Sequence, residues 1–187
     1  AYAGDNFSDE IFYNNCIPAP SAPSLSTINI TNLTTSSAYS GGNISSDGGA
    51  YINQKGICYS TSTNPSILNN LFINNGGGSE SYQSVIQNLS INTTYYVRAY
   101  AFNYMDTAYG NEISFTTLSE SIATLSTNPV ININSNSAES GGNITNDGNA
   151  AITSRGVCWS TSPNPTISNN ITTNGTGTGS FSSTLSN

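Results

Sequence analysis

The chain has 187 residues, 7% of them charged, with 10 acidic and 3 basic side chains, no histidine and a net charge of −7. So acidic a chain repels phosphate backbones and anionic lipid, which excludes nucleic acid as a partner. It has no run of apolar residues long enough to cross a membrane, so direct membrane insertion is not expected. Its regularly spaced Ile, Val, Leu and Tyr residues predict a folded chain.

All predicted elements are β-strands. Short alternating stretches rich in Thr, Tyr, Val and Ile are bounded by Gly, Asn, Asp and Pro, and no helical periodicity persists. This spacing of short strands and turns is typical of a β-sandwich. In chain order, we expect strands over residues 25–30, 38–44, 51–59, 71–73 (weak), 82–89, 94–103 and 108–116.

Two Asp-Gly pairs are predicted to form hairpin turns. Asp47-Gly48 and Asp147-Gly148 lie between alternating runs, where Asp-Gly supplies the positive φ angle that a tight turn needs. The alternative is that these aspartates bind calcium. A calcium ion requires about six to eight oxygen ligands, and each pair offers one acid, so we favour the turn.

The strand expected at 94–103 shows the clearest alternation. Tyr95, Val97 and Ala99 are predicted to face the core, because side chains on a strand point alternately to its two faces. The other residues of this strand are predicted to face outward, next to two tyrosines near the following hairpin. Together they would form either an aromatic platform that binds a ligand or a surface of cross-strand packing in which the arginine stacks on a tyrosine. This candidate platform consists of Tyr96, Arg98, Tyr100, Tyr104 and Tyr109.

The cysteines are predicted to be structural. Cys58 and Cys158 occupy the same position in two similar segments, so they should lie about one domain apart, beyond the ~7 Å Cα separation of a disulfide. We expect both to be small buried thiols. Cys16 has no counterpart further along the chain, and its partner, if it has one, would lie in a preceding part of the protein.

The sequence repeats itself at an offset of 100 residues. GICYSTS at 56–62 recurs as GVCWSTS at 156–162, and residues 1–3 and 10–11 match 99–101 and 112–113. A period of this length predicts separate domains in series. We expect the C-terminal end of a preceding repeat at 1–17, a complete repeat at 18–118, and a following repeat at 119–187 that lacks strands F and G.

No catalytic set is apparent. The chain has no histidine, no paired cysteines at metal-ligand spacing and no glycine loop followed by lysine, so we expect no enzyme activity and no cofactor. A calcium site is the one weak metal candidate: Asp106 and Glu112 flank the last predicted hairpin. Acids of the preceding segment, at positions 5, 9 and 10, would join them at a junction between repeats.

The region after Leu89 carries a family resemblance. Leu89, Tyr95 and the TTYYVRAYA stretch at 93–101 resemble the E-to-F region of fibronectin type III domains, in which this leucine and tyrosine form the tyrosine corner. With the recurring GGNI and GICYSTS-like segments, the chain resembles tandem repeats of large secreted surface proteins of Bacteroidota, including gliding-motility adhesins. The resemblance implies an all-β fold: tandem fibronectin type III/Ig-like β-sandwich domains, one complete and two partial.

The resemblance also implies a location and partners. We expect an extracellular or cell-surface protein exported by the type IX route, whose partners are neighbouring repeats of the same chain, surface glycans and the secretion machinery. Asp106-Thr107-Ala108 resembles an O-glycosylation acceptor of Bacteroidota, with the glycan on Thr107.

Three functions are compatible with these patterns. The first is a non-catalytic repeat segment of an adhesin or extracellular fibre, used as a stalk or for attachment or gliding. The second is a spacer or carbohydrate-binding module of a secreted glycoside hydrolase or other extracellular enzyme. The third is a subunit of a self-assembling extracellular filament.

Overall fold

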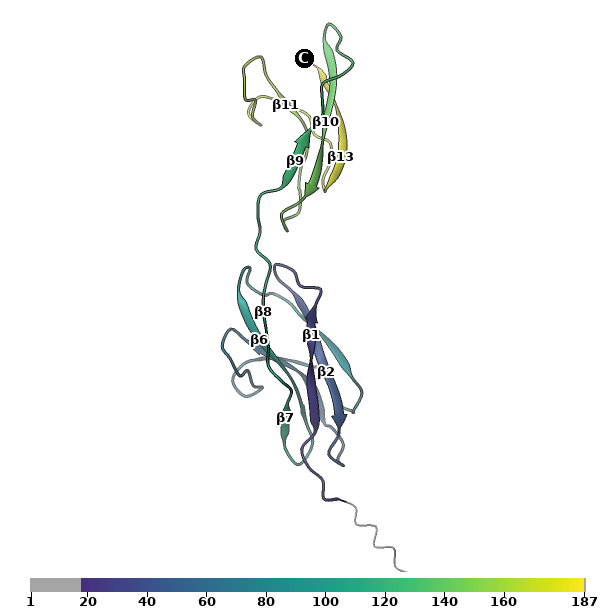
Figure 1. Cartoon of the computed structure of the whole chain (residues 1–187), viewed down its shortest axis with the longest axis vertical. Helices are drawn as coiled ribbons and strands as arrows, with labels where there is room; N and C mark the ends of the chain where they lie inside the picture. The colour runs from purple at the N-terminus through teal and green to yellow at the C-terminus, as the bar shows by residue number, and fades with distance from the viewer. Residues whose placement is uncertain (1–17, 187) are drawn as a thin grey trace, which may run out of the picture.

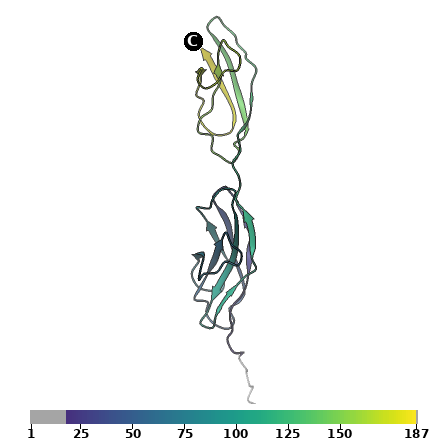
Figure 2. The ribbon, with the colours of Figure 1, turned by 90° about the vertical axis from the view of Figure 1, so that its left-hand side faces the viewer.

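The structure, a computed structural model, describes residues 18–186, which form two β-sandwich units joined by residues 117–123. Figures 1 and 2 show, from two directions, the units one after the other along the chain. The described residues form β-strands and no helices, as predicted. The segment 1–17, with Cys16 and the predicted end of a preceding repeat, lies outside them.

The first sheet of the complete unit contains three antiparallel strands. They are β1 (Ser24–Thr31), β2 (Ala38–Ser46) and β5 (Tyr82–Ile86), in the order β1-β2-β5. Gly41 lies where β2 meets β5, and a Cβ there would come within 2.0 Å of the carbonyl oxygen of Tyr82. The glycine is therefore required for these two strands to pair so closely.

The second sheet of the complete unit is built on the long strand β6. Its members are β4 (Leu71–Asn74), β3 (Gln54–Ser60), β6 (Thr94–Phe102), β7 (Thr107–Tyr109) and β8 (Ile113–Thr116). β3 pairs with β4 and β6, and β7 and β8 both pair with β6. The fourth strand thus joins the second sheet and not the first, which is the strand order of fibronectin type III sandwiches.

The predicted strand at 108–116 is divided into β7 and β8. The break lies at Gly110, whose N–H donates to the carbonyl of Ala99 at 2.9 Å. A Cβ at Gly110 would lie 2.6 Å from the Thr27 side-chain oxygen, so β1 passes directly against this break. Local alternation does not reveal the break, because its cause is a contact with a strand far away in the sequence.

The core of the complete unit lies between the two sheets. Tyr95, Val97 and Ala99 of β6 are buried in it, as predicted, together with Ile57 and Ile86. Val97 has no exposed surface, and burying such a side chain contributes about 1.5–3 kcal/mol. β6 is therefore the strand on which both sheets of this unit depend.

The second unit has the same strand order as far as it is described. One sheet contains β9 (Thr124–Thr127), β10 (Ser137–Asn146) and β13 (Gly179–Ser186), and the other contains β11 (Cys158–Trp159) and β12 (Asn170–Ile171). These strands correspond to β1, β2, β5, β3 and β4. The described part of this unit holds no strand corresponding to β6, β7 or β8.

The turns show that the two units are structurally equivalent. Asn64 and Asn164 both have a φ angle of 56°, and Gly48 and Gly148 have φ angles of 74° and 72°. Positive φ angles disfavour most side chains, which explains why Asn and Gly recur at these positions. The predicted Asp-Gly turns are confirmed: Asp47 and Asp147 each accept a hydrogen bond from the N–H two residues further on.

No helix long and apolar enough to span a membrane occurs among residues 18–186.

Candidate binding surface

The predicted aromatic platform on β6 is only partly exposed. Tyr100 is fully buried, so its predicted place on an exposed face is wrong. Its ring makes an edge contact with Phe72 at 6.1 Å, and its hydroxyl accepts a hydrogen bond from the Gln54 side chain at 2.6 Å. The physical reason is Gly56 on the adjacent strand, which has no side chain and leaves room for the ring.

Arg98 and Tyr109 form a packed pair across β6 and β7. The guanidinium carbon lies 4.7 Å from the centre of the Tyr109 ring, and Nε donates to the carbonyl of Gly110 at 3.1 Å. The Tyr109 hydroxyl accepts a hydrogen bond from the N–H of Ile67 at 3.2 Å. Arg98 therefore stacks on a tyrosine, and Tyr96 beside it is half-buried. The outward face of β6 is therefore a packed surface and not a flat open platform.

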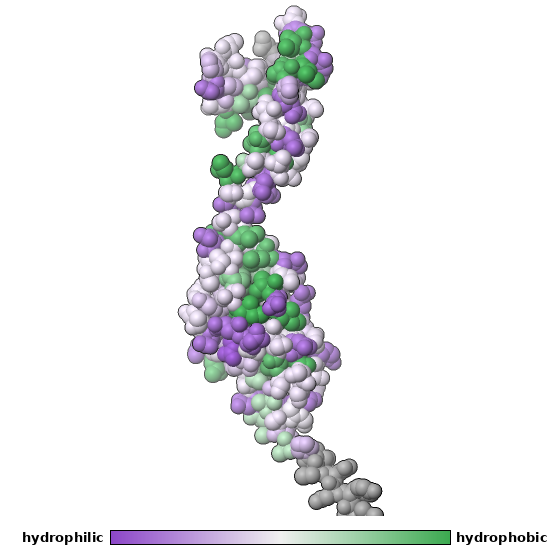
Figure 3. All heavy atoms as spheres, viewed as in Figure 1, coloured by the Kyte–Doolittle hydropathy of each residue, from purple (hydrophilic) through white to green (hydrophobic). Residues whose placement is uncertain are grey.

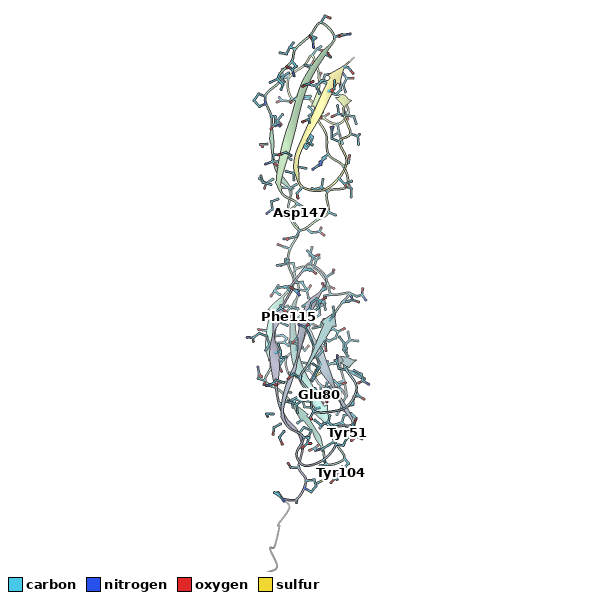
Figure 4. The ribbon with its side chains drawn as sticks, turned by 90° about the vertical axis from the view of Figure 1, so that its right-hand side faces the viewer. Tyr51, Glu80, Tyr104, Phe115 and Asp147 are labelled. Carbon is cyan, nitrogen blue, oxygen red and sulfur yellow. The ribbon has the colours of Figure 1, made fainter. Side chains whose placement is uncertain are left out.

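An exposed aromatic tip is instead found at one pole of the complete unit. Tyr51 and Tyr104 are each 70% exposed and Met105 is 49% exposed. Figure 4 shows both labelled tyrosines at the same end of the unit, opposite Phe115. Tyr104 was a predicted candidate, whereas Tyr51 was not singled out: it was placed at the start of the strand predicted at 51–59, but the observed strand β3 begins only at Gln54.

Asn103 holds the loop beneath this tip in place. Its side-chain amide donates to the carbonyls of Ser21 and Asp47 at 2.7 and 2.8 Å, and its side-chain oxygen accepts from the N–H groups of Met105 and Asp106. One buried side chain thereby joins the entering linker, the β2–β3 turn and the β6–β7 loop. The tip is consequently a preformed surface.

The two calcium candidates each accept a hydrogen bond from a backbone N–H group. Asp106 accepts a hydrogen bond from the N–H of Thr107 at 2.6 Å, and Glu112 accepts one from the N–H of Asn64. Within residues 18–186 no group of three metal-binding side chains is close enough to hold an ion. Thr107 itself is half-buried, and its glycosylation remains a prediction.

The predicted tyrosine corner is present. Leu89 and Tyr95 are buried, and the Tyr95 hydroxyl accepts a hydrogen bond from the N–H of Ser90 at 3.0 Å. Thr117 closes the same corner by donating to the carbonyl of Ser90 at 2.6 Å. The connection between the two sheets is therefore fixed by side-chain contacts.

A buried cation on β3, Lys55, was not singled out as a site residue. Lys55 is 4% exposed, and its Nζ donates to the main-chain oxygen of Glu80 at 2.8 Å and to its carboxylate at 3.1 Å. Arg155, the equivalent residue, binds carbonyls of the corresponding loop, including that of Thr178 at 2.7 Å. The sequence signal was a basic residue at the same position of both repeats. In each unit it clamps the loop between the fourth and fifth strands.

The cysteines differ in environment. Cys58 is buried, as predicted, and its thiol lies 3.3 Å from the carbonyl oxygen of Pro65. Burial raises the pKa of the Cys58 thiol to about 11, against a smaller opposing effect of Arg98. Cys158 is only half-buried, because the described part of its unit has no strand equivalent to β6 to cover it. Neither forms a disulfide with a described residue.

We expect Cys58 to react with iodoacetamide at pH 8 at least about 100 times more slowly than Cys158. Raising a thiol pKa by about two units lowers the reactive thiolate fraction about 100-fold, and burial adds to this. The measurement is mass spectrometry of tryptic peptides over time in a Cys16→Ser background. Equal rates in the folded chain would contradict the burial of Cys58.

A second expected result concerns high pH. The Tyr82 hydroxyl donates to the carbonyls of Gly56 and Tyr100 at 2.6 and 3.2 Å, and burial raises its pKa well above the usual value near 10. Above about pH 10 the unfolded chain loses this proton and the folded chain keeps it. The free energy of unfolding therefore falls with pH, by up to about 1.4 kcal/mol per pH unit for such a tyrosine.

The control for this result is Tyr82→Phe. The equivalent position of the second unit already holds a phenylalanine, Phe181. Urea unfolding followed by circular dichroism between pH 9 and 12 should give a shallower decline for the variant. Equal declines would show that Tyr82 does not titrate on unfolding.

Comparisons with known proteins give a likeness in structure alone. No family model matches the sequence and no curated protein matches it. Among solved structures, titin domains A168–A170 are 18% identical with a TM-score of 0.38, over 53% of this chain and 32% of that chain. The titin kinase with its flanking domains is 12% identical with a TM-score of 0.37, over 67% of this chain and 27% of that chain.

A third solved structure is the sensor domain of the anti-sigma factor RsgI4 of Pseudobacteroides cellulosolvens. It is 18% identical with a TM-score of 0.38, over 52% of this chain and 76% of that chain. The fold assignment rests on the strand order described above. By that order, the described residues form β-sandwich units of the fibronectin type III/Ig-like class.

Proposed function

We propose that this chain is a non-catalytic repeat segment of a large secreted adhesin or extracellular fibre, of the kind resembled by the surface proteins of Bacteroidota. It would act outside the cell as a stalk in attachment or gliding motility. Its partners would be the neighbouring repeats of the same chain, with surface glycans and the secretion machinery as further partners. No cofactor takes part in this role.

The observation that carries this proposal is the serial connection of the units. The chain enters the complete unit at β1 and leaves it after β8 at the opposite pole, so a following unit extends the molecule (Figure 1). The N–H of Ser21 donates to the carbonyl of Gly48 at 2.8 Å, and Ser121 makes the same bond to Gly148 at 2.8 Å. The same contact ties each linker to its own unit, which supports an array that gains length with each repeat.

The surface chemistry suits an extracellular location. Figure 3 shows a surface that is largely polar or of intermediate hydropathy, with separate apolar clusters. Trypsin-like proteases cut after lysine and arginine, and this chain has three such side chains. Lys55 is buried and Arg98 is stacked on Tyr109, so two of the three are protected by the fold. Such a chain is suited to survive outside the cell.

The proposal is tested by immunoblotting of source-cell fractions with an antibody raised against residues 18–118. The expected result is a very large species in the surface-attached fraction, because many repeats in one chain are needed for a stalk. A single band of ordinary enzyme size in the medium would contradict it. That outcome would favour the spacer module of a secreted enzyme.

A carbohydrate-binding module is the second candidate, favoured by the exposed Tyr51 and Tyr104 at one pole. Planar aromatic rings are suited to stack on sugar rings. A glycan array probed with the full chain and with Tyr51→Ala/Tyr104→Ala tests this role. Binding that the double variant loses would support it, and absence of binding by the full chain would contradict it.

A further inference from the structure

The linker between the two units is hydrogen-bonded on both sides of one residue. Residues 117–123 connect the units, and Figures 1 and 2 show a single length of chain passing between them. Each peptide group is planar, so every residue of such a linker contributes two soft backbone torsions, φ and ψ. The hydrogen bonds of the linker therefore decide where the chain between the units can turn.

The first residues of the linker are held by the complete unit. The N–H of Leu118 donates to the carbonyl of Thr34 at 3.0 Å, and the carbonyl of Leu118 accepts from the N–H of Asn92 at 3.3 Å. The residue before it, Thr117, is 2% exposed. The peptide group that joins Leu118 to Ser119 is therefore fixed to the complete unit.

The next residues of the linker are held by the second unit. The carbonyl of Ser119 accepts a hydrogen bond from the side-chain amide of Asn149 at 2.9 Å, and the N–H of Ser121 donates to the carbonyl of Gly148 at 2.8 Å. A Cβ at Gly148 would lie 2.1 Å from the main-chain oxygen of Ser121, so the linker lies directly against this turn. The peptide groups on both sides of Glu120 are therefore fixed to the second unit.

We propose that Ser119 is a hinge between the units and that the side chain of Asn149 confines this hinge to one residue. The last peptide group fixed to the complete unit and the first one fixed to the second unit meet at the Cα atom of Ser119. Only the φ and ψ torsions of Ser119 lie between them, and hinges of proteins are residues that absorb such torsion changes. This inference does not depend on the proposed function.

The complete unit shows that the turn itself does not need the Asn149 side chain. Its equivalent residue is Gly49, and the two residues have similar φ angles of 66° and 75°. The same turn thus forms with glycine, which has no amide to donate. The side chain of Asn149 is therefore free to hold the linker, and breaking its bond to Ser119 would add the φ and ψ torsions of Glu120 to the hinge.

The test measures how easily a protease cuts the linker of the folded full chain. Glu120 is the single glutamate of residues 117–123, so a glutamyl endopeptidase cuts the linker there, and mass spectrometry follows the fragment that ends at Glu120. We expect Asn149→Gly to be cut about 2–10 times faster than the unchanged chain. This is the factor that corresponds to the loss of one hydrogen bond, because cutting of a folded chain follows the population of its locally open form.

Matched variants make the test specific. Asn149→Asp has nearly the same shape as the unchanged residue but no N–H to donate, so it should give the same gain as Asn149→Gly if glycine loosens the turn by itself. Asn136→Asp adds the same charge at an exposed residue of the β9–β10 loop and should leave the rate unchanged. Nitrogen-15 relaxation by NMR should show low order parameters at Ser119 alone in the unchanged chain and at both Ser119 and Glu120 in the Asn149 variants.

Two results would overturn the inference. One is a cutting rate at Glu120 that neither Asn149 variant raises in a chain shown to be folded by circular dichroism. The other is a set of low order parameters from Leu118 through Ser121 in the unchanged chain. In that case the whole linker is flexible and the hydrogen bonds of Leu118, Ser119 and Ser121 do not hold it in solution.

Discussion

The Ile52→Ala substitution is expected to lower the free energy of unfolding of the complete unit by about 2–5 kcal/mol. Ile52 is 1% exposed and lies in the connection between β2 and β3. Removing three carbons of its side chain leaves a cavity that the close-packed neighbours cannot fill. Hydrogen exchange of the amides of β3 and β6, followed by mass spectrometry, measures the change.

Ile152→Ala is the matched control, because the two isoleucines occupy the same position of their repeats. Ile152 is half-buried, so replacing it by alanine should lower the free energy of unfolding by about 1 kcal/mol or less, measured by urea unfolding followed by Trp159 fluorescence. Equal costs at the two positions would mean that Ile152 is packed as tightly as Ile52 in solution.

The Thr27→Val substitution is expected to destabilise the complete unit by about 1–3 kcal/mol. The Thr27 hydroxyl donates to the carbonyl of Asn111 at 2.5 Å and accepts from the N–H of Ala99 at 2.9 Å, and the residue is 7% exposed. Valine has nearly the same shape, so the change removes these bonds and leaves both partners unsatisfied. These contacts join the middle of β1 to the break between β7 and β8.

The expected signature is local. Exchange of the Ala99 amide, measured by NMR, should accelerate more than that of amides in β5. Thr127→Val is the control, since Thr127 is exposed and its substitution should change the unfolding free energy by less than about 0.5 kcal/mol. Unchanged protection of Ala99 in Thr27→Val would show that the hydroxyl does not hold this amide.

The features predicted from sequence are those set by local alternation and turn chemistry. The inward set Tyr95, Val97 and Ala99 follows from the two-residue period of a strand, and the Asp-Gly turns follow from the φ angles that they must adopt. The tyrosine corner follows from the family resemblance, and the hydrogen bond between Ser90 and Tyr95 confirms it. In each case the determining residues are close in sequence.

The features missed depend on neighbours far away in the sequence. Tyr100 belongs to the outward set of β6 by alternation, yet the absence of a side chain at Gly56 and the edge of Phe72 bury it. In the sequence Thr27 is an ordinary polar strand residue, and nothing near it indicates its contact with Asn111, which is 84 positions away. Of the exposed tip, only Tyr104 was predicted, because Tyr51 reaches the same pole from a different loop.

In the stalk that we propose, hydrogen bonds of side chains and backbone would hold the linkers and outer strands of the complete unit in place. In the complete unit, Thr27 holds β1 to the loop after β7, and Thr117 holds the chain that follows β8 to Ser90. Ser21 and Ser121 tie the linkers to the units that follow them. The tip formed by Tyr51 and Tyr104 lies at the pole where the chain enters its unit.

The most direct test of this account is immuno-electron microscopy of intact source cells with gold-labelled antibody against residues 18–118. The account predicts label outside the cell, at distances from its surface greater than the length of one unit, and loss of that label after brief treatment of the cells with a broad-specificity protease. Label confined to the cell interior, or none on the cells with all antigen in the medium, would contradict it.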